Sequence, residues 1–321
     1  MHDVAAVREL SRKFGIRAGA INPNLFEDQM YKFGSFGNPD PAIRRHALDH
    51  VLESIAIATE LGVVDVSLWF ADGSNYPGTQ SIRRRIEWFK EGLANAHNAL
   101  TANQRMLIEY KPFEPAFYHT DIGDWGMALL LARAAGPQAS VLVDTGHHYP
   151  SQNVEQIVVW LQQENMLGGL HLNDRRYADD DLTLGSIDPY QVFRIFHEIQ
   201  MDRWERPQSV APAYVIDQSH NLKNKVEAMV QTVVTAQELY AKACLVDRAR
   251  LNLLQLESRL VEAEECLRSA FWIDTRPHLR AWRESRGLPS DPLQALRDSG
   301  YVDRISRERC GKNRSGASSY A

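Results

Sequence analysis

Short apolar runs alternate along the chain with longer segments in which apolar residues recur at helical spacing. The apolar runs predict strands at residues 16–22, 63–70, 105–110, 140–144, 167–172 and 213–217. Helical patterns lie between them at 41–61, 83–98, 124–135, 153–165 and 190–200, and one more follows the last run as far as about residue 240. Strands that alternate with helices predict βα units and a parallel sheet. This many units favours a (β/α)8 barrel over an open sheet, and no Gly-x-Gly-x-x-Gly turn follows a strand to suggest nucleotide binding.

The pattern changes after residue 240. Residues 245–271 carry apolar residues near helical spacing, and shorter helices are predicted at 277–286 and 292–299. Small and polar residues dominate 306–321. We therefore predict a catalytic barrel at 1–240, a helical arm at 241–300 that packs on the barrel or on another subunit, and a disordered tail at 301–321.

The bulk composition is that of an ordinary globular enzyme. Among 321 residues, 44% are hydrophobic and 24% are charged, and the net charge of −5 gives no electrostatic footprint for nucleic acid. The three cysteines, Cys244, Cys266 and Cys310, are too few and too far apart for a disulfide framework or a thiolate metal site. No stretch approaches the roughly 18 apolar residues of a membrane span, and the N-terminus has no apolar signal core. The expected location is the cytoplasm.

Four residues with metal-binding side chains end four of the predicted strands: Glu109, Asp144, His171 and Asp217. In a barrel, the carboxyl ends of the strands converge on one face, where active sites lie. Three carboxylates in a buried site repel one another unless a cation joins them. Hard oxygen ligands with one nitrogen suit Mn²⁺, Mg²⁺ or Co²⁺.

A second set of such residues lies close by in the sequence. His147 follows Asp144 by three residues, and Asp179 and Asp181 lie two apart, so that both can face one way in an extended segment. Asp144 could then bridge two ions, which together can clamp both oxygens of a reacting centre.

Each residue also has a plainer interpretation. An acidic residue at a strand end often caps a helix or carries a loop charge, a histidine on an apolar strand is usually a satisfied core residue, and three successive aspartates usually form a solvated loop. Four strands that deliver the same chemistry at one end favour a metal site. These residues by themselves leave the reaction open.

Around these residues the chain resembles a known family. The segments WFADGSNYPG, EYKPFEPAFYHTDIGDWG, LVDTGHHYPSQNVE, GGLHLNDRRYADDDL and YVIDQSHN are similar to those of L-rhamnose isomerases of the Pseudomonas type, which belong to the xylose-isomerase-like barrels. The resemblance extends over nearly the whole chain. It implies reversible conversion of L-rhamnose to L-rhamnulose by a metal-assisted hydride shift, with D-allose and L-mannose as further substrates.

The resemblance also assigns metal ligands residue by residue. One set matches the ligands of a structural ion: Glu109, Asp144, His171 and Asp217. The other set matches the ligands of a catalytic ion: His147, Asp179 and Asp181, with Asp144 shared. The implied cofactors are two divalent cations, Mn²⁺ before Mg²⁺, Co²⁺ or Zn²⁺.

Further residues are implied in substrate binding and catalysis. Lys111 matches a lysine near the sugar's O1 and O2, where its charge would stabilise negative charge on oxygen, although it could instead pair with a ligand carboxylate. Trp69 could stack on the sugar or pack in the core, and His147 is expected at the sugar as well. Asp217 and Asp179 are the expected partners of the water that moves a proton between O2 and O1.

The resemblance leaves one expectation about the N-terminus. Family members begin upstream of this Met1 with a strand that carries a His-x-Pro-Trp-Asp motif, so we expect the first barrel strand and part of the sugar pocket to be missing. A weak further strand is predicted at 182–187. A truncated sequence and a real short form, inactive or able only to bind metal or sugar, both stay open.

The expected partners are a small sugar and other copies of the chain in a homotetramer, with neither nucleic acid nor membrane. An endonuclease of the same barrel type is the other enzyme to consider. The net charge of −5 and the carboxylate-rich ligand set argue against it.

Overall fold

The structure, a computed structural model, describes residues 4–114, 118–175, 181–218 and 222–309. The chain divides into two compact units. The first is Met1–Asp180 with Arg206–Asp217, and the second is Asp181–Glu205 with Gln218–Ala321. No helix in the described ranges is long and apolar enough to span a membrane.

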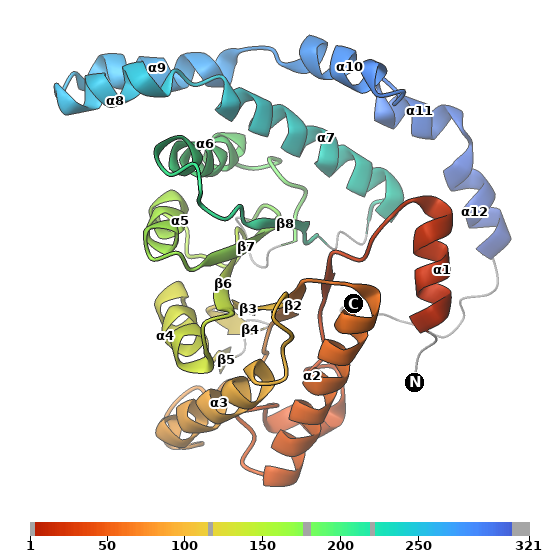
Figure 1. Cartoon of the computed structure of the whole chain (residues 1–321), viewed down its shortest axis with the longest axis vertical. Helices are drawn as coiled ribbons and strands as arrows, with labels where there is room; N and C mark the ends of the chain where they lie inside the picture. Colours follow the sequence, from red (N-terminus) through yellow and green to blue (C-terminus); the bar gives the residue numbers. More distant parts are fainter. Residues whose placement is uncertain (1–3, 115–117, 176–180, 219–221, 310–321) are drawn as a thin grey trace. The chain divides into compact units, whose positions relative to one another are not determined.

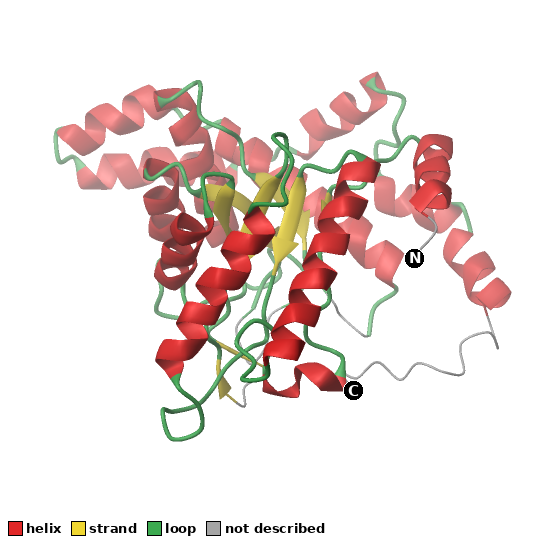
Figure 2. Cartoon of the chain, turned by 60° about the horizontal axis from the view of Figure 1, so that its bottom comes forward, coloured by secondary structure: helices red, strands yellow, loops and turns green. Residues whose placement is uncertain are grey.

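The first unit is built on a parallel sheet that has six strands in the described residues (Figures 1 and 2). The strands are neighbours in chain order: β1 (Ala20–Ile21), β2 (Asp65–Leu68), β3 (Arg105–Glu109), β6 (Ala139–Asp144), β7 (Leu167–Leu172) and β8 (Ala213–Ile216). Their valine, isoleucine and leucine side chains are largely buried, as in sheets covered on both faces. The sheet curls into part of a TIM barrel, which confirms the predicted fold class, and β1 and β8 are its edges within the described ranges.

Helices pack against one face of this sheet (Figure 1). They are α2 (Pro41–Leu61), α3 (Ile82–His97), α4 (Trp125–Ala135) and α5 (Val154–Gln163), and α1 (Val4–Phe14) packs on α2. A polar side chain caps the first turn of each of the four: Asp40, Ser81, Asp124 and Asn153. These caps satisfy backbone N–H groups that the helix leaves unpaired. Each helix buries apolar side chains on the face toward the sheet, such as Phe89 and Leu93 on α3.

Two short segments lie at the carboxyl end of the sheet. The 3-10 helix η1 (Gln29–Phe33) follows β1, and an antiparallel hairpin of β4 (Phe113–Glu114) and β5 (Tyr118–His119) follows β3. The hairpin is fixed to the loop after β2, because Tyr118 Oη donates to Ala71 O at 2.6 Å and Asp121 N donates to Asp72 O at 2.9 Å. The loops after β2 and β3 are therefore held together.

The second unit is helical in the residues that are described. Its helices are α6 (Pro189–Glu205), α7 (Lys225–Cys244), α8 (Arg248–Leu256), α9 (Leu260–Trp272), α10 (Arg276–Ser285), α11 (Pro292–Asp298) and α12 (Tyr301–Arg309). Helices α6, α9, α10 and α11 all contact α7, and α8 packs on α9. Residue 240, where the sequence placed the end of the barrel, lies inside α7, and α12 occupies the first part of the segment expected to be a tail.

Three sequence expectations differ from the observed elements. The strand expected at 16–22 pairs only at Ala20–Ile21. The weak strand at 182–187 is wrong, since Ser186 N donates to Thr183 O at 3.0 Å and closes a turn. The helix expected through 245–271 is broken into α8 and α9, because Ser258 has a left-handed backbone with φ of 54°.

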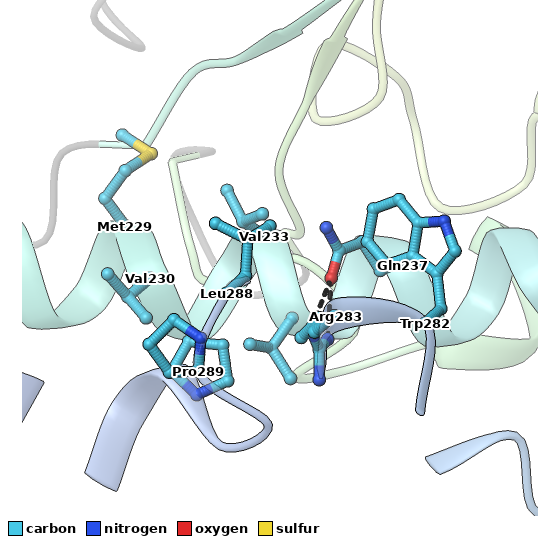
Figure 3. Close-up of a pocket in the computed structure, with 10 residues that line it drawn as sticks. Met229, Val230, Val233, Gln237, Trp282, Arg283, Leu288 and Pro289 are labelled. Atoms are coloured by element: carbon cyan, nitrogen blue, oxygen red, sulfur yellow. Dashed lines mark hydrogen bonds between the residues drawn. The ribbon is translucent and has the colours of Figure 1, made fainter. Parts of the chain in front are cut away.

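An apolar groove of about 270 Å³ lies along α7, where α10 and the segment that follows it pack (Figure 3). Val233, Trp282 and Leu288 are among its lining residues. Beside it, the buried guanidinium of Arg283 donates to Gln237 Oε1 at 2.6 Å and to Ser290 O at 3.3 Å. These bonds hold α10 and the following turn on α7.

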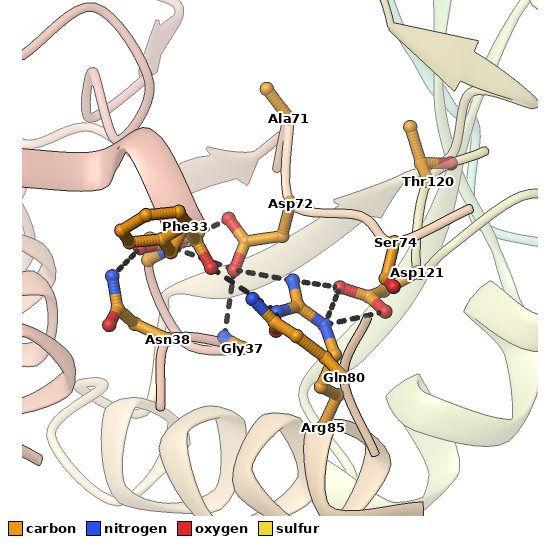
Figure 4. Close-up of polar contacts among 12 residues, drawn as sticks. Phe33, Gly37, Asn38, Ala71, Asp72, Ser74, Gln80, Arg85, Thr120 and Asp121 are labelled. Carbon is orange, nitrogen blue, oxygen red and sulfur yellow. Dashed lines mark hydrogen bonds and ion pairs between the residues drawn. The ribbon is translucent and has the colours of Figure 1, made fainter. Parts of the chain in front are cut away.

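A buried cation in the first unit joins the loops at the carboxyl end of the sheet (Figure 4). The side chain of Arg85 on α3 is 0% exposed, and its Nη2 lies 2.7 Å from Asp121 Oδ2 and 3.9 Å from Asp72 Oδ2. Asp72 in turn accepts hydrogen bonds of 2.7 Å from the backbone N–H groups of Ser35 and Gly37. The loops after β1 and β2 and the hairpin after β3 therefore share one network of charges.

We expect Arg85→Met to lower the free energy of unfolding by about 3–5 kcal/mol, because it leaves two buried carboxylates without their cation. Urea unfolding of the purified protein measures the change. The matched control is Arg133→Met, which removes an ion pair to Glu164 whose side chains are 50% and 41% exposed, and it should cost under about 1 kcal/mol. Equal small losses in both variants would contradict a structural role for Arg85.

A second stability prediction concerns His197, a buried residue on α6. Burial first, and then the charge of Arg248, lower its pKa from 6.5 to about 4. Between these two values the unfolded chain binds the proton and the folded chain does not. The stabilisation is therefore complete above pH 6.5 and is lost as the pH falls toward 4, by up to about 1.4 kcal/mol per pH unit.

The test compares the free energy of unfolding of the wild type and His197→Leu at several pH values between 7 and 4.5. Leucine does not titrate, so the wild type should lose stability more steeply with falling pH than the variant. Parallel curves would contradict a depressed pKa at His197.

Candidate metal centre

Four side chains converge at the carboxyl ends of β3, β6, β7 and β8: Glu109, Asp144, His171 and Asp217. One ligand atom from each lies within 4.8 Å of those of the other three. Asp144 and His171 are register partners on neighbouring strands. Glu109 pairs with Leu142, two residues before Asp144, so it lies on the same face of the sheet. The structure thus brings together the four residues that the strand ends predicted.

His171 lies at the centre of this group. Its Nδ1 is 3.0 Å from Asp217 Oδ2, 3.3 Å from Glu109 Oε1 and 3.7 Å from Asp144 Oδ2. The side chains of Glu109, Asp144 and His171 are at most 4% exposed, whereas that of Asp217 is 48% exposed. Within the first unit, solvent therefore reaches the group at Asp217.

The charges in this group depend on one another. Burial raises the pKa of Glu109, but the charge on His171 and hydrogen bonds from His147 and His171 outweigh it and lower the pKa to about 2. Burial lowers the pKa of His171, but the charge on Glu109 and the hydrogen bond with Asp217 outweigh it and raise the pKa well above its usual value. Glu109 is thus kept ionised beside a positive charge on His171. Three carboxylates and one imidazole at this spacing fit a hard divalent cation.

His147 lies beside the four residues, in the loop after β6. Its Nδ1 is 2.9 Å from Tyr110 O and 3.3 Å from Glu109 Oε1. Because a carbonyl oxygen only accepts, Nδ1 carries the hydrogen and Nε2 is the ring's potential ligand atom. The backbone just after β3 therefore orients this ring.

The two other ligands expected for a second ion lie outside the described part of the first unit. Asp179 lies outside the described residues. Asp181 belongs to the second unit, where it is half-buried and has a left-handed backbone with φ of 68°.

Lys111 and Trp69 contact each other just beyond the ends of β3 and β2. The Nζ atom of Lys111 lies 5.7 Å from the centroid of the Trp69 ring, within the range of a cation–π contact. Phe26 packs edge-on against the same ring at 4.6 Å. The Nε1 atom of Trp69 is buried and has no hydrogen-bond partner in the part of the chain that the structure describes. The side chains of Lys111 and Trp69 therefore lie next to each other at the carboxyl end of the sheet.

Two polar contacts at the site were missed from the sequence. Asn173 Nδ2 donates to both oxygens of Asp144, at 2.9 Å and 3.1 Å. Its signal was its position two residues after His171, which puts both side chains on the same face of a strand. The other contact joins Tyr110 Oη to His148 Nε2 at 2.7 Å, where burial lowers the pKa of His148 to about 3. No spacing predicts it, because only the fold brings these residues together.

These features define a class of protein: a TIM barrel whose carboxyl end carries a group suited to a divalent metal ion. The chain belongs to the xylose isomerase-like TIM barrel family, whose sequence model matches residues 1–206.

The chain is similar to several known proteins. A probable sugar isomerase of Rhizobium meliloti (strain 1021) is 39% identical over 312 residues, which cover 96% of this chain and 73% of that protein. A xylose isomerase of Thermus thermophilus is 27% identical over 204 residues, 60% of this chain and 52% of the relative. The crystal structure of 3-keto-D-glucoside 4-epimerase from E. coli has a TM-score of 0.58 at 12% identity, over 73% of this chain and 84% of that one. The last likeness shows the fold alone.

We expect Asp144→Asn to weaken Mn²⁺ binding by about 100-fold or more, because it removes the most buried carboxylate of the group. Isothermal titration calorimetry on metal-stripped protein gives the dissociation constant. The matched control is Asp65→Asn, a buried aspartate at the start of β2 that pairs with Arg105 at 2.8 Å and lies outside the group. An unchanged constant in Asp144→Asn, or an equal loss in both variants, would contradict a metal site here.

Proposed function

We propose that the protein is a metal-dependent aldose–ketose isomerase that interconverts L-rhamnose and L-rhamnulose, with D-allose and L-mannose as further substrates. The observation that carries the proposal is the convergence of Glu109, Asp144, His171 and Asp217 at the carboxyl end of a barrel. Membership of the xylose isomerase-like family and 39% identity to a probable sugar isomerase support the reaction class. The resemblance of the site motifs supports L-rhamnose.

The proposed ion ligands follow from the donor groups. The first ion is assigned to Glu109, Asp144, His171 and Asp217. A second ion is assigned to His147, Asp179 and Asp181, with Asp144 shared between the two ions, on the motif resemblance. When bound, such divalent cations, Mn²⁺ first among them, polarise sugar oxygens and favour hydride transfer between C2 and C1.

In this proposal, side chains of the protein bind the sugar and take part in proton transfer. The Lys111 ammonium stabilises negative charge on the sugar's oxygens, which a preorganised cation does at no cost of reorganisation. The Trp69 ring, held by Phe26 and Lys111, offers a flat apolar surface for the sugar. The Asp217 carboxylate is the exposed member of the group within the first unit, with Oδ2 3.0 Å from His171 Nδ1, and is proposed as a partner of the water that moves a proton between O2 and O1. Asp179 is proposed as its partner on the motif resemblance.

The motif resemblance also supports a homotetramer as the working form, and the expected location is the cytoplasm. The net charge of −5 favours a small neutral substrate over nucleic acid.

The test is an NMR assay of L-rhamnose, D-allose and L-mannose with metal-stripped protein to which single divalent cations are added. We expect ketose formation with Mn²⁺ or Co²⁺, and none in excess chelator. Lys111→Met should lower kcat/KM by about 100-fold or more, while Lys90→Met, at an exposed position on α3, should leave it unchanged.

Failure to convert any aldose with any cation would overturn the proposal. An epimer in place of the ketose would move the protein to another reaction of the same sugar class. Cleavage of abasic DNA would instead favour a nuclease.

A further inference from the structure

Asp144 is the carboxylate of the metal group that the protein holds most firmly. Its residue is 0% exposed. Its Oδ1 accepts hydrogen bonds from Gly146 N at 2.7 Å and from Asn173 Nδ2 at 2.9 Å. Its Oδ2 lies 3.1 Å from Asn173 Nδ2 and 3.7 Å from His171 Nδ1. Both oxygens thus accept a hydrogen bond from Asn173, Oδ1 accepts another from the backbone, and Oδ2 lies toward His171.

Asn173 is itself fixed in place. It is 1% exposed and lies just beyond β7. Its backbone N donates to Thr145 Oγ1 at 3.0 Å, and that hydroxyl lies 2.8 Å from Asn173 O. Because a carboxylate only accepts, the amide must turn its NH₂ group toward Asp144. The loop after β6 and the end of β7 therefore lock the donor and its acceptor together.

The chemistry of an amide suits this place. It donates hydrogen bonds without bringing a positive charge, so Asp144 keeps its full negative charge for a cation. A lysine or arginine would neutralise the carboxylate, as Arg85 does with Asp121 at 2.7 Å. A second carboxylate would repel it. Asparagine orients the ligand and leaves the attraction for the ion intact.

We propose that Asn173 is a positioning residue that fixes the plane of the Asp144 carboxylate and presents Oδ2 to the divalent cation. The inference rests on the proposed function only for the binding of an ion by this group. It requires no particular sugar or reaction.

The experiment measures the Mn²⁺ dissociation constant of metal-stripped wild type and Asn173→Ala by isothermal titration calorimetry. We expect a loss of about 10–100-fold, the usual effect of removing a partner that orients a metal ligand. The melting temperature without metal should match that of Asn38→Ala, which removes a buried amide that donates to Gly34 O at 2.6 Å. The rise in melting temperature on adding Mn²⁺ should be reduced in Asn173→Ala and unchanged in Asn38→Ala.

The dependence of kcat and KM on the Mn²⁺ concentration distinguishes a positioning role from a contact with substrate. With isomerase activity, Asn173→Ala should need more Mn²⁺ for half-maximal rate, and saturating Mn²⁺ should restore kcat with an unchanged KM for the sugar. If Asn173→Ala does not fold, Thr145→Val is the second variant. It removes the hydroxyl that binds the backbone of Asn173 and also donates to His171 O at 3.2 Å, and a loss of several-fold is expected.

The outcomes separate this inference from the proposed function. Wild type that binds no Mn²⁺ overturns both. Wild type that binds Mn²⁺, with a constant unchanged within twofold in Asn173→Ala or weakened equally in Asn38→Ala, overturns the positioning role alone. Weakened binding in Asn173→Ala without any aldose conversion supports the positioning role and counts against the isomerase.

Discussion

Repulsion among three carboxylates around one imidazole nitrogen is the constraint on which this site depends. Asp217, Glu109 and Asp144 each place an oxygen within 3.7 Å of His171 Nδ1. Ionised carboxylates taken out of water at this spacing are costly unless positive charge lies between them. A proton on His171 supplies some of that charge, and a divalent cation supplies more. The parallel strands serve this arrangement, because their common direction brings all four side chains to one end of the sheet.

The same end of the sheet holds a second acidic pair, whose negative charge is balanced by a side chain of the protein. Asp121 and Asp72 lie at 2.7 Å and 3.9 Å from the guanidinium of Arg85, a cation that belongs to the chain and never loses its charge. That network, shown in Figure 4, joins Asp72 in the loop after β2 to Asp121 in the segment after β5. Trp69 and Lys111 begin the loops after β2 and β3. The cluster around Arg85 is thus neutralised permanently by the protein. The cluster around His171 depends on a proton or a metal ion, both of which can be exchanged with solvent. An exchangeable charge is what a metal site requires.

The sequence predicted the features that repeat along the chain or sit at the ends of its elements. Helix α2 begins and ends where its pattern predicts, and Glu109, Asp144, His171 and Asp217 were recognisable because strand ends in a barrel face one way. Features that depend on long-range packing were not recognisable. The left-handed backbone at Ser258 that separates α8 from α9 has no local signal such as glycine. The pairing of Tyr110 with His148 also needs the fold. Asn173 had a signal, its spacing from His171, but an asparagine at a strand end has too many ordinary uses to be singled out.

Anomalous diffraction from crystals grown with Mn²⁺ tests the central claim most directly, because it locates the ion without reference to any reaction. We expect a strong anomalous peak enclosed by the side chains of Glu109, Asp144, His171 and Asp217. A difference map with no peak there, or Mn²⁺ bound only elsewhere on the molecule, would contradict it.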